Sequence, residues 1–272
     1  MNSGTIMGMT LSAVISLGSV AVAFGQTPTP TPQDEPDFIV PARPTVSNPA
    51  EFQRPGVLQL EVGANSSTSI QQDVPVALRF AISRRVLVEF DLDSPYSVRG
   101  PLGSRQTGWG DGQLGLQVVV QHEDRSRPGL AIAYYIKVPT ASARRGLGTG
   151  KADHSLVGLV SKTVRKTTVD FNAIYLLAGR TLRNSHTSSG QGAFAVTQKL
   201  NKRFGIQGEL SGSSRNDRQP GAMFGLGVAT YQINRRMIID GGVRMGLTPD
   251  AARVGFVAGV TLGVANLYKH RH

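Results

Sequence analysis

The chain has 272 residues, a formal net charge of +11 and no cysteine. Without cysteine, a disulfide framework and thiolate metal sites are excluded. The 32 glycines, the 15 prolines and a charged fraction of only 17% favour many short strands joined by turns over long helices.

The positive charge would suggest nucleic-acid binding if it formed a stripe. Instead, ten basic residues occur as pairs in five short segments: Arg84 and Arg85, Arg125 and Arg127, Arg165 and Lys166, Lys202 and Arg203, Arg235 and Arg236. Apart from these and two at the C-terminus, 17 basic residues stand against 18 acidic ones. We therefore expect no nucleic-acid partner.

Two N-terminal segments precede the predicted fold. Residues 11–24 form an apolar run without charge, and Ala23-Phe24-Gly25 fits a small-x-small cleavage site, so we predict a signal peptide over 1–25. No Lys or Arg precedes the run, and the alternative is an uncleaved membrane anchor, for which the run is short. Residues 26–55 are rich in proline, which removes backbone donors, and predict a periplasmic linker or a flexible plug segment.

From Val57 onward, apolar residues recur with a period close to two, which is typical of strands. Most of the segments have eight to thirteen residues, near the 9–11 that a tilted strand needs to cross a bilayer. The twelve expected strands are 57–65, 74–82, 86–93, 112–121, 129–138, 154–164, 168–178, 192–200, 204–212, 222–233, 237–246 and 253–265.

The connections between these strands alternate in length. Segments such as 83–85 and 165–167 are short, whereas segments such as 94–111 and 139–153 are long and rich in Gly, Ser and Arg. Outer-membrane barrels have short periplasmic turns and long outer loops. The sequence thus predicts an all-β, closed antiparallel up-and-down transmembrane barrel over 56–268, located in the outer membrane with both termini periplasmic.

Closure satisfies every backbone hydrogen bond inside hydrocarbon, and alternation gives the barrel two faces. One apolar row, including Leu116, Ile132 and Phe256, would face lipid. A soluble β-sandwich has the same period, but its apolar row would be buried. The polar row predicted to line the lumen contains Glu61, Arg79, Glu89, Asp91, Gln117, Lys137, Asp170, Asn172, Gln207, Glu209, Asp240 and Arg244, with further glutamines that include Gln59.

Three stretches in order resemble a known family. They are "GWGDGQLGLQVVV" from Gly108, "YYIKVPTAS" from Tyr134 and "VDFNAIY" from Val169. Together they resemble the outer-membrane family labelled "putative MetA pathway of phenol degradation" over roughly 57–265. The resemblance implies a transporter barrel associated with aromatic degradation. It departs from the family at Ala141, where Gly is usual, and at the C-terminus, where Tyr268 is the nearest aromatic residue for recognition by the barrel-assembly machinery.

Other motifs favour a non-enzymatic protein without cofactors. In Asp153-His154-Ser155, neighbouring residues of a strand point to opposite faces, so His154 and Ser155 cannot share a proton. "GLGTG" at 146–150 lacks the helix and the Lys-Ser/Thr of a phosphate-binding loop. Five scattered histidines give no metal-ligand spacing.

The predicted function is therefore passage of small solutes through a polar lumen, and the resemblance adds aromatic or hydrophobic compounds as candidates. The alternative is a non-conducting structural or interaction barrel. Lumen charges either select small polar or anionic solutes or pair with one another and fill the space. The expected partners are outer-membrane lipid, the assembly machinery and an unidentified solute.

Overall fold

The computed structural model describes residues 37–67, 72–93, 96–99, 105–180, 185–217 and 219–268. The predicted signal peptide and residues 26–36 of the predicted linker lie outside the described residues.

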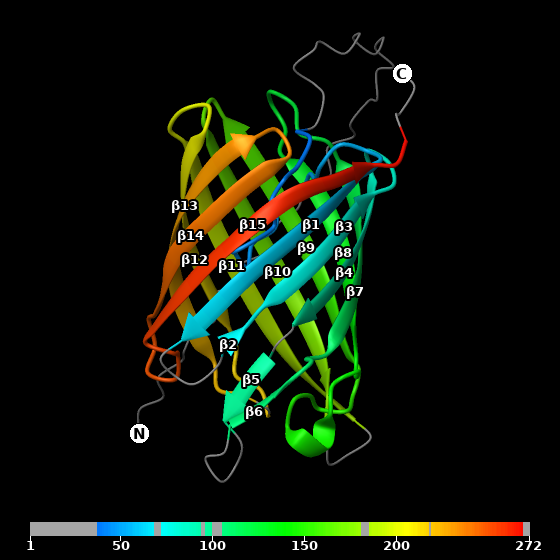
Figure 1. The fold of residues 1–272 in the computed structure, drawn as a ribbon, viewed down its shortest axis with the longest axis vertical. Coiled ribbons are helices and arrows are strands. Elements are labelled where there is room, and N and C mark those ends of the chain that lie inside the picture. The colour runs from blue at the N-terminus through cyan, green and yellow to red at the C-terminus, as the bar shows by residue number, and fades with distance from the viewer. Residues whose placement is uncertain are drawn as a thin grey trace, which may run out of the picture. The chain divides into compact units, whose positions relative to one another are not determined.

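Twelve long strands form the wall of a barrel (Figure 1). They are β1 (Val57–Ser67), β3 (Pro75–Ala81), β4 (Val86–Asp93), β7 (Gly112–Gln121), β8 (Gly129–Val138), β9 (Asp153–Val164), β10 (Thr167–Gly179), β11 (His186–Lys199), β12 (Phe204–Ser213), β13 (Ala222–Asn234), β14 (Met237–Gly246) and β15 (Val254–Asn266). Three short strands, β2 (Gln72–Asp73), β5 (Tyr96–Arg99) and β6 (Arg105–Gly108), extend the sheet at the end of β1, and a 3-10 helix (Ala143–Arg145) lies between β8 and β9.

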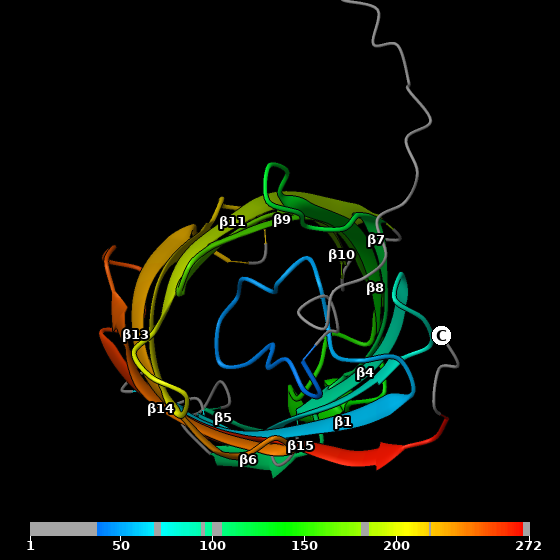
Figure 2. The same ribbon diagram turned by 90° about the horizontal axis from the view of Figure 1, so that it is seen from above.

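The wall closes on itself through the first and last strands. β15 pairs antiparallel with β1 from Val57–Asn266 to Ser67–Gly255, and every other wall strand pairs with its sequence neighbours in the wall. Figure 2, viewed from above, shows the resulting ring. Closure leaves no unpaired edge among these twelve strands, which is the condition for a sheet in lipid. The predicted closed twelve-stranded antiparallel barrel is confirmed.

The predicted strand bounds agree with the structure to within two residues, with one exception. β11 begins at His186, six residues before the predicted start at 192. The segment 186–191 contains Ser, Thr and Gly and lacks an apolar row, so its composition indicates a loop. Backbone pairing with β10 nevertheless continues to Gly179–His186 and keeps the segment extended.

The apolar row faces outward. Leu116, Ile132 and Phe256 are 44%, 53% and 60% exposed, whereas Gln117, the neighbour of Leu116, is 1% exposed. A soluble β-sandwich, which would bury the apolar row, is thereby excluded. The described residues contain no helix with the length and apolar character needed to span a membrane.

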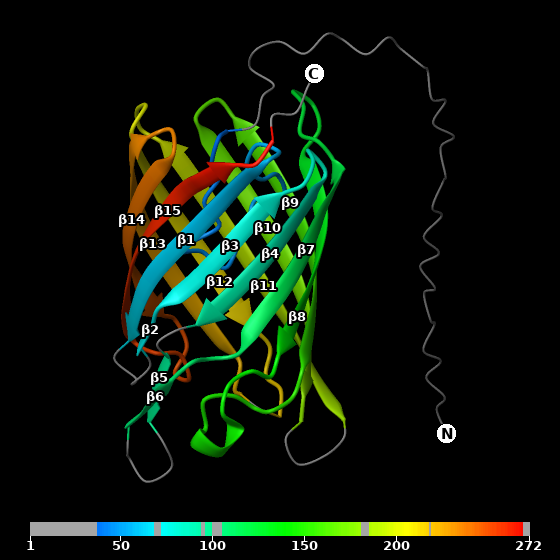
Figure 3. The same cartoon turned by 45° about the vertical axis from the view of Figure 1, so that its right-hand side comes forward.

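The two ends of the barrel differ in their connections (Figures 1 and 3). At one end lie the short turns, including the two-residue turn 165–166, in which Arg165 has a φ of 59°. In the turn between β7 and β8, Asp124 accepts hydrogen bonds from the backbone N–H groups of Arg127 and Ser126 and from the Arg127 guanidinium. These bonds lower the pKa of the Asp124 carboxyl.

The C-terminal segment meets the start of the barrel at the short-turn end. The N–H of Leu267 donates to the carbonyl of Gly56, and the N–H of Gly56 donates to the carbonyl of Ala81. The Tyr268 hydroxyl donates to the carbonyl of Ile82, and its ring packs edge-on against Phe80 with centroids 6.0 Å apart.

Candidate functional site: the occupied lumen

Residues 37–56 run inside the ring of strands (Figure 2). They contain no helix or strand, yet Ile39, Ala50, Phe52 and Gln53 are each at most 4% exposed. A buried chain without regular structure must find other partners for its backbone groups. The wall supplies them, and we name residues 37–56 the internal segment.

Two wall carboxylates each bind consecutive backbone N–H groups of the internal segment. Glu61 on β1 accepts from Ala42 N and Arg43 N, each at 3.0 Å. On β12, Glu209 accepts from Val46 N at 3.1 Å and from Ser47 N at 2.7 Å, and also from the Ser47 hydroxyl at 2.8 Å. Hydrogen bonds to an ionised acceptor are the stronger kind, so these two residues are the main anchors.

Two wall amides bind the segment in both directions. Gln59 accepts from Val40 N at 2.9 Å and donates to Val40 O at 2.8 Å. Asn172 on β10 accepts from Asn48 N at 2.6 Å and donates to Asn48 O at 2.9 Å. Each of these two amides thus satisfies both backbone groups of one residue, so both recognise the main chain of the segment.

The middle of the segment is held by a hydroxyl and a third amide. Ser161 on β9 accepts from Ala50 N at 2.8 Å and donates to the Asp170 carboxylate at 2.5 Å. Gln117 on β7 donates to Pro49 O and Ala50 O at 3.2 and 3.0 Å. Asp170 therefore acts on the segment through the orientation of Ser161.

Arg79 connects the segment to a buried ion network. Its side chain is fully buried on β3 and donates to Val40 O at 3.0 Å. The guanidinium lies 3.5 Å from Glu61 and 3.3 Å from Glu89. Buried charges require such partners, because each has lost its hydration.

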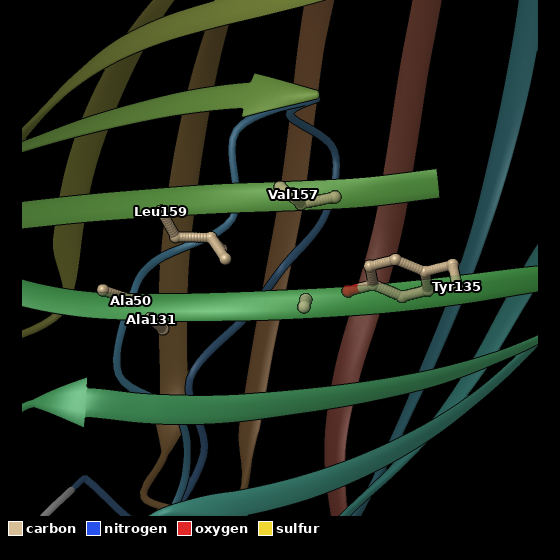
Figure 4. Packing of buried hydrophobic residues seen from close by; sticks show 6 residues of the cluster. Ala50, Ala131, Tyr135, Val157 and Leu159 are labelled. Carbon is tan, nitrogen blue, oxygen red and sulfur yellow. The ribbon is translucent and has the colours of Figure 1, made fainter. Parts of the chain in front are cut away.

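Apolar contacts also hold the internal segment against the wall. Ala50 packs with Ala131, Tyr135, Val157 and Leu159, which project inward from β8 and β9 (Figure 4). A second cluster joins Phe52 to Ala81, Leu87 and Val119. The expectation of a wholly polar inner row is therefore incomplete, because part of the wall is apolar where the segment covers it.

A notch in the wall receives the side chain of Arg43. Gly63 on β1 and Gly259 on β15 are cross-strand partners, and a Cβ at either would collide with the Arg43 guanidinium. The guanidinium donates to Asn65 Oδ1 at 3.4 Å and to Ala258 O at 3.5 Å.

A cavity of about 630 Å³ remains between the internal segment and the wall strands β1, β3, β4, β7 and β8. Lys137 lines it and bridges Asp111 and Asp153, with its Nζ 2.9 Å from a carboxylate oxygen of each. The carboxylates facing the cavity are Glu61, Glu89, Asp91, Asp111 and Asp153, and the basic groups are Arg43 and Lys137. With Arg79, which pairs with Glu61 and Glu89, five acidic groups stand against three basic ones, so the cavity keeps a formal acidic excess.

The predicted lumen residues divide into three groups. Seven are buried and contact the segment or one another: Glu61, Arg79, Glu89, Gln117, Asp170, Asn172 and Glu209. Asp91 and Lys137 face the cavity. The structure does not bring Gln207, Asp240 and Arg244 to that cavity, and Arg244 lies over the Phe224 ring, 5.9 Å from its centroid.

Three contributors were missed by the sequence reasoning. Ser161 belongs to an inward row with little polar character, while Asp111 precedes β7 and Asp153 begins β9. Asp111 and Asp153 could have been found from their positions at strand ends, since Asp153 is the partner of Lys137 in the ladder and Asp111 lies two residues before Gln113, the partner of Lys137 on β7. The internal segment itself has no period that could have placed it.

The residues considered for catalysis are separated by the wall. Asp153 binds Lys137 inside, whereas His154 Nδ1 lies 2.6 Å from the Tyr134 hydroxyl on the exposed face. Gly148 and Thr149 of the "GLGTG" stretch line the cavity. Within the described part of the chain, His, Asp and Glu form no group of three that could hold a metal ion.

A closed antiparallel barrel with an apolar outer face and an occupied polar lumen defines the class of outer-membrane β-barrels. The chain belongs to the family described as "Putative MetA-pathway of phenol degradation", whose model matches residues 42–265. The predicted family is thus confirmed, and the match includes most of the internal segment.

Solved structures share the fold at low sequence identity. The COG4313 outer membrane channel from Pseudomonas putida F1 aligns with a TM-score of 0.62 and 12% identity, covering 78% of this chain and 97% of that chain. The NanC porin aligns with a TM-score of 0.54 and 10% identity, covering 75% of this chain and 98% of that chain. No curated protein matches the chain in sequence.

Proposed function

We propose that the protein is a non-enzymatic outer-membrane channel for small solutes, and that the internal segment is a plug that must move before the lumen conducts. The observation that carries the proposal is a closed barrel whose lumen holds a chain segment by its backbone beside a cavity of about 630 Å³. The structural neighbours described as a channel and a porin support it. Short turns and both termini would then be periplasmic.

The contacts of the segment suit reversible displacement. Glu61 and Glu209 would be hydrated in a lumen that water fills when the segment leaves, so neither carboxylate would remain buried without a partner. A neutral hydrogen bond exchanged with water contributes only about 0.5–1.5 kcal/mol net. The apolar contacts centre on Ala50 and Phe52, which limits their contribution.

The solute class proposed is small aromatic or hydrophobic compounds. The family description refers to phenol degradation. Apolar inward residues exist where such a solute could pass, including Leu87, Leu159 and the cluster of Leu226, Val228 and Val257. Alternating apolar and polar wall groups would let an aromatic ring and its polar substituent both find contacts.

Conductance of the full-length purified protein in planar bilayers tests the proposal. We expect single-channel steps separated by long closed periods. Silence at high protein load, with the barrel correctly folded, would support the alternative of a structural or interaction barrel.

We further propose that the predicted lumen residues line the solute path. Lys137→Glu would add negative charge to a cavity that already has an acidic excess and would shift the reversal potential in a salt gradient toward cation selectivity. Arg244→Glu, outside that cavity, is the matched comparison and should shift it less. Unchanged reversal potentials in both variants would contradict the assignment.

Assembly in the outer membrane would require recognition by the barrel-assembly machinery. Tyr268 is the proposed C-terminal aromatic signal, and its ring packs on Phe80 of β3, the neighbour of β1.

A further inference from the structure

The short-turn end of the barrel carries a ring of exposed basic side chains, which we name the basic rim. All ten members are exposed: Arg84, Arg85, Arg125, Arg127, Arg165, Lys166, Lys202, Arg203, Arg235 and Arg236. Because each turn closes a pair of adjacent strands, the five pairs are spread along the sheet from β3 to β14 and not gathered in one patch.

Few carboxylates offset this charge within the turns. Four of the five turns contain no acidic residue in their sequence. In the fifth, Asp124 pairs with Arg127, and neighbouring Glu123 pairs with Lys162. The basic rim therefore retains a strong positive charge that faces outward.

Exposed apolar residues lie directly beside the basic pairs. Val164 is 61% exposed next to Arg165, Leu200 is 52% exposed before Lys202, and Ile82 is 44% exposed before Arg84. A change from exposed apolar to exposed basic groups over one to two residues is typical of the level where hydrocarbon meets headgroups.

An aromatic pair marks the same level. The rings of Phe204 and Tyr231 lie 4.8 Å apart on β12 and β13, and Phe204 is 49% exposed. The Tyr231 hydroxyl accepts a hydrogen bond from Arg203 at 3.4 Å. Aromatic residues with polar tips are enriched at membrane interfaces. The hydrogen bond to Tyr231 therefore holds the Arg203 side chain at the expected level of the interface.

We propose that the basic rim binds the phosphate groups of anionic phospholipids and so fixes the short-turn end in the phospholipid leaflet. Guanidinium groups match phosphate oxygens in geometry and charge, and juxtamembrane basic residues are attracted to anionic lipid surfaces. The proposal rests on the outer-membrane location proposed above. It adds a lipid partner of stated chemistry and gives the proposed periplasmic orientation of the short-turn end a physical cause.

Native mass spectrometry of the full-length protein, released from mixed micelles of phosphatidylglycerol and phosphatidylcholine, tests this proposal. We expect the protein to retain phosphatidylglycerol at least fivefold over phosphatidylcholine. The variant Arg84→Gln/Arg85→Gln/Arg235→Gln/Arg236→Gln should lose most of this preference. The matched control, Arg144→Gln/Arg145→Gln/Arg215→Gln/Arg253→Gln at the long-loop end, should keep it.

Two competitors separate the sources of the phosphate group. Inorganic phosphate should displace phosphatidylglycerol only weakly, because it lacks the acyl chains that place the headgroup at the rim. Complete displacement by inorganic phosphate would reduce the rim to a simple anion site and contradict the proposal. Preferential retention of lipopolysaccharide would contradict it too, since it would assign the rim to the opposite leaflet.

The outcome is independent of the channel proposal. Both variants must be folded, which heat-modifiable gel mobility checks. Equal lipid preference in both would then overturn the lipid proposal and would not affect the channel proposal. A protein that shows no conductance but prefers phosphatidylglycerol would overturn the channel proposal and support the lipid proposal.

Discussion

The inner and outer faces of the same strands respond to different physical demands. On β7, Leu116 and Gln117 are neighbours in sequence, yet Leu116 is 44% exposed on the outer face and Gln117 is buried against Pro49 and Ala50. Outer residues need only be apolar, because lipid has no fixed partner groups. Inner residues meet particular backbone atoms of the internal segment. The same period-two alternation therefore produces an outer surface that accepts any apolar residue and an inner surface that requires particular residues.

The largest loss of unfolding free energy is expected for a substitution in the lumen, at Arg79. Arg79→Met leaves Glu61 and Glu89 buried beside one another without their shared cation, and breaking a buried ion pair in this way costs about 3–5 kcal/mol. Urea unfolding in detergent measures the loss. The matched control Arg79→Met/Glu89→Gln should recover part of it, and equal stability of the single variant and the native protein would contradict the buried network.

The next effect belongs to the outer face. Leu116→Arg places a charge near the middle of β7 on the lipid side and should lower the unfolding free energy by about 2–4 kcal/mol in liposomes. The conservative Leu116→Met should change it little. If Leu116→Arg were neutral, Leu116 would not face hydrocarbon and the assignment of the two faces would be wrong.

A smaller effect is expected at the anchor Glu209. Glu209→Gln removes the charge that accepts from Val46 N, Ser47 N and the Ser47 hydroxyl, and should destabilise the occluded lumen by about 2 kcal/mol. That corresponds to an open fraction about 30-fold higher, measured as open probability in planar bilayers. Ser211→Ala, two residues along the same inward row, is the control and should leave the open probability unchanged.

The smallest effect is expected at the exposed Asp124. Its pKa is lowered by hydrogen bonds in the folded turn, so the carboxylate contributes stability above its unfolded pKa of about 4 and loses it as the pH falls through the folded value. Asp124→Asn should be slightly less stable than the native protein at pH 7, and the two should converge in strong acid. A difference that grows on acidification would contradict the turn geometry.

The wall could be predicted from sequence because its determinants are local. Alternation along each strand, turn residues such as Ser83-Arg84-Arg85 and loop lengths set the strands and their order. The start of β11 is predicted too far along the chain, because its first residues have no apolar row. Pairing with β10, which is a tertiary effect, keeps these residues extended.

The lumen could be predicted only in part. The alternation pattern predicts inward positions for Glu61, Arg79, Asn172 and Glu209. It does not predict that they bind the internal segment, because that segment is irregular and is bound largely through its backbone. Inward Leu87 and Leu159 resemble outward residues in composition, and only the packing of Phe52 and Ala50 explains them. Backbone recognition leaves little trace in the sequence of the bound segment.

A reversible lock on the internal segment tests the central claim most directly. The chain contains no cysteine, so Ala50→Cys and Ser161→Cys introduce one pair at a contact where Ala50 N lies 2.8 Å from Ser161 Oγ. With single-cysteine variants as controls, planar-bilayer recordings of the oxidised double variant should be silent, and channel steps should return on reduction of the same protein. Equal conductance before and after reduction, with the disulfide formed, would show that the segment does not gate the lumen.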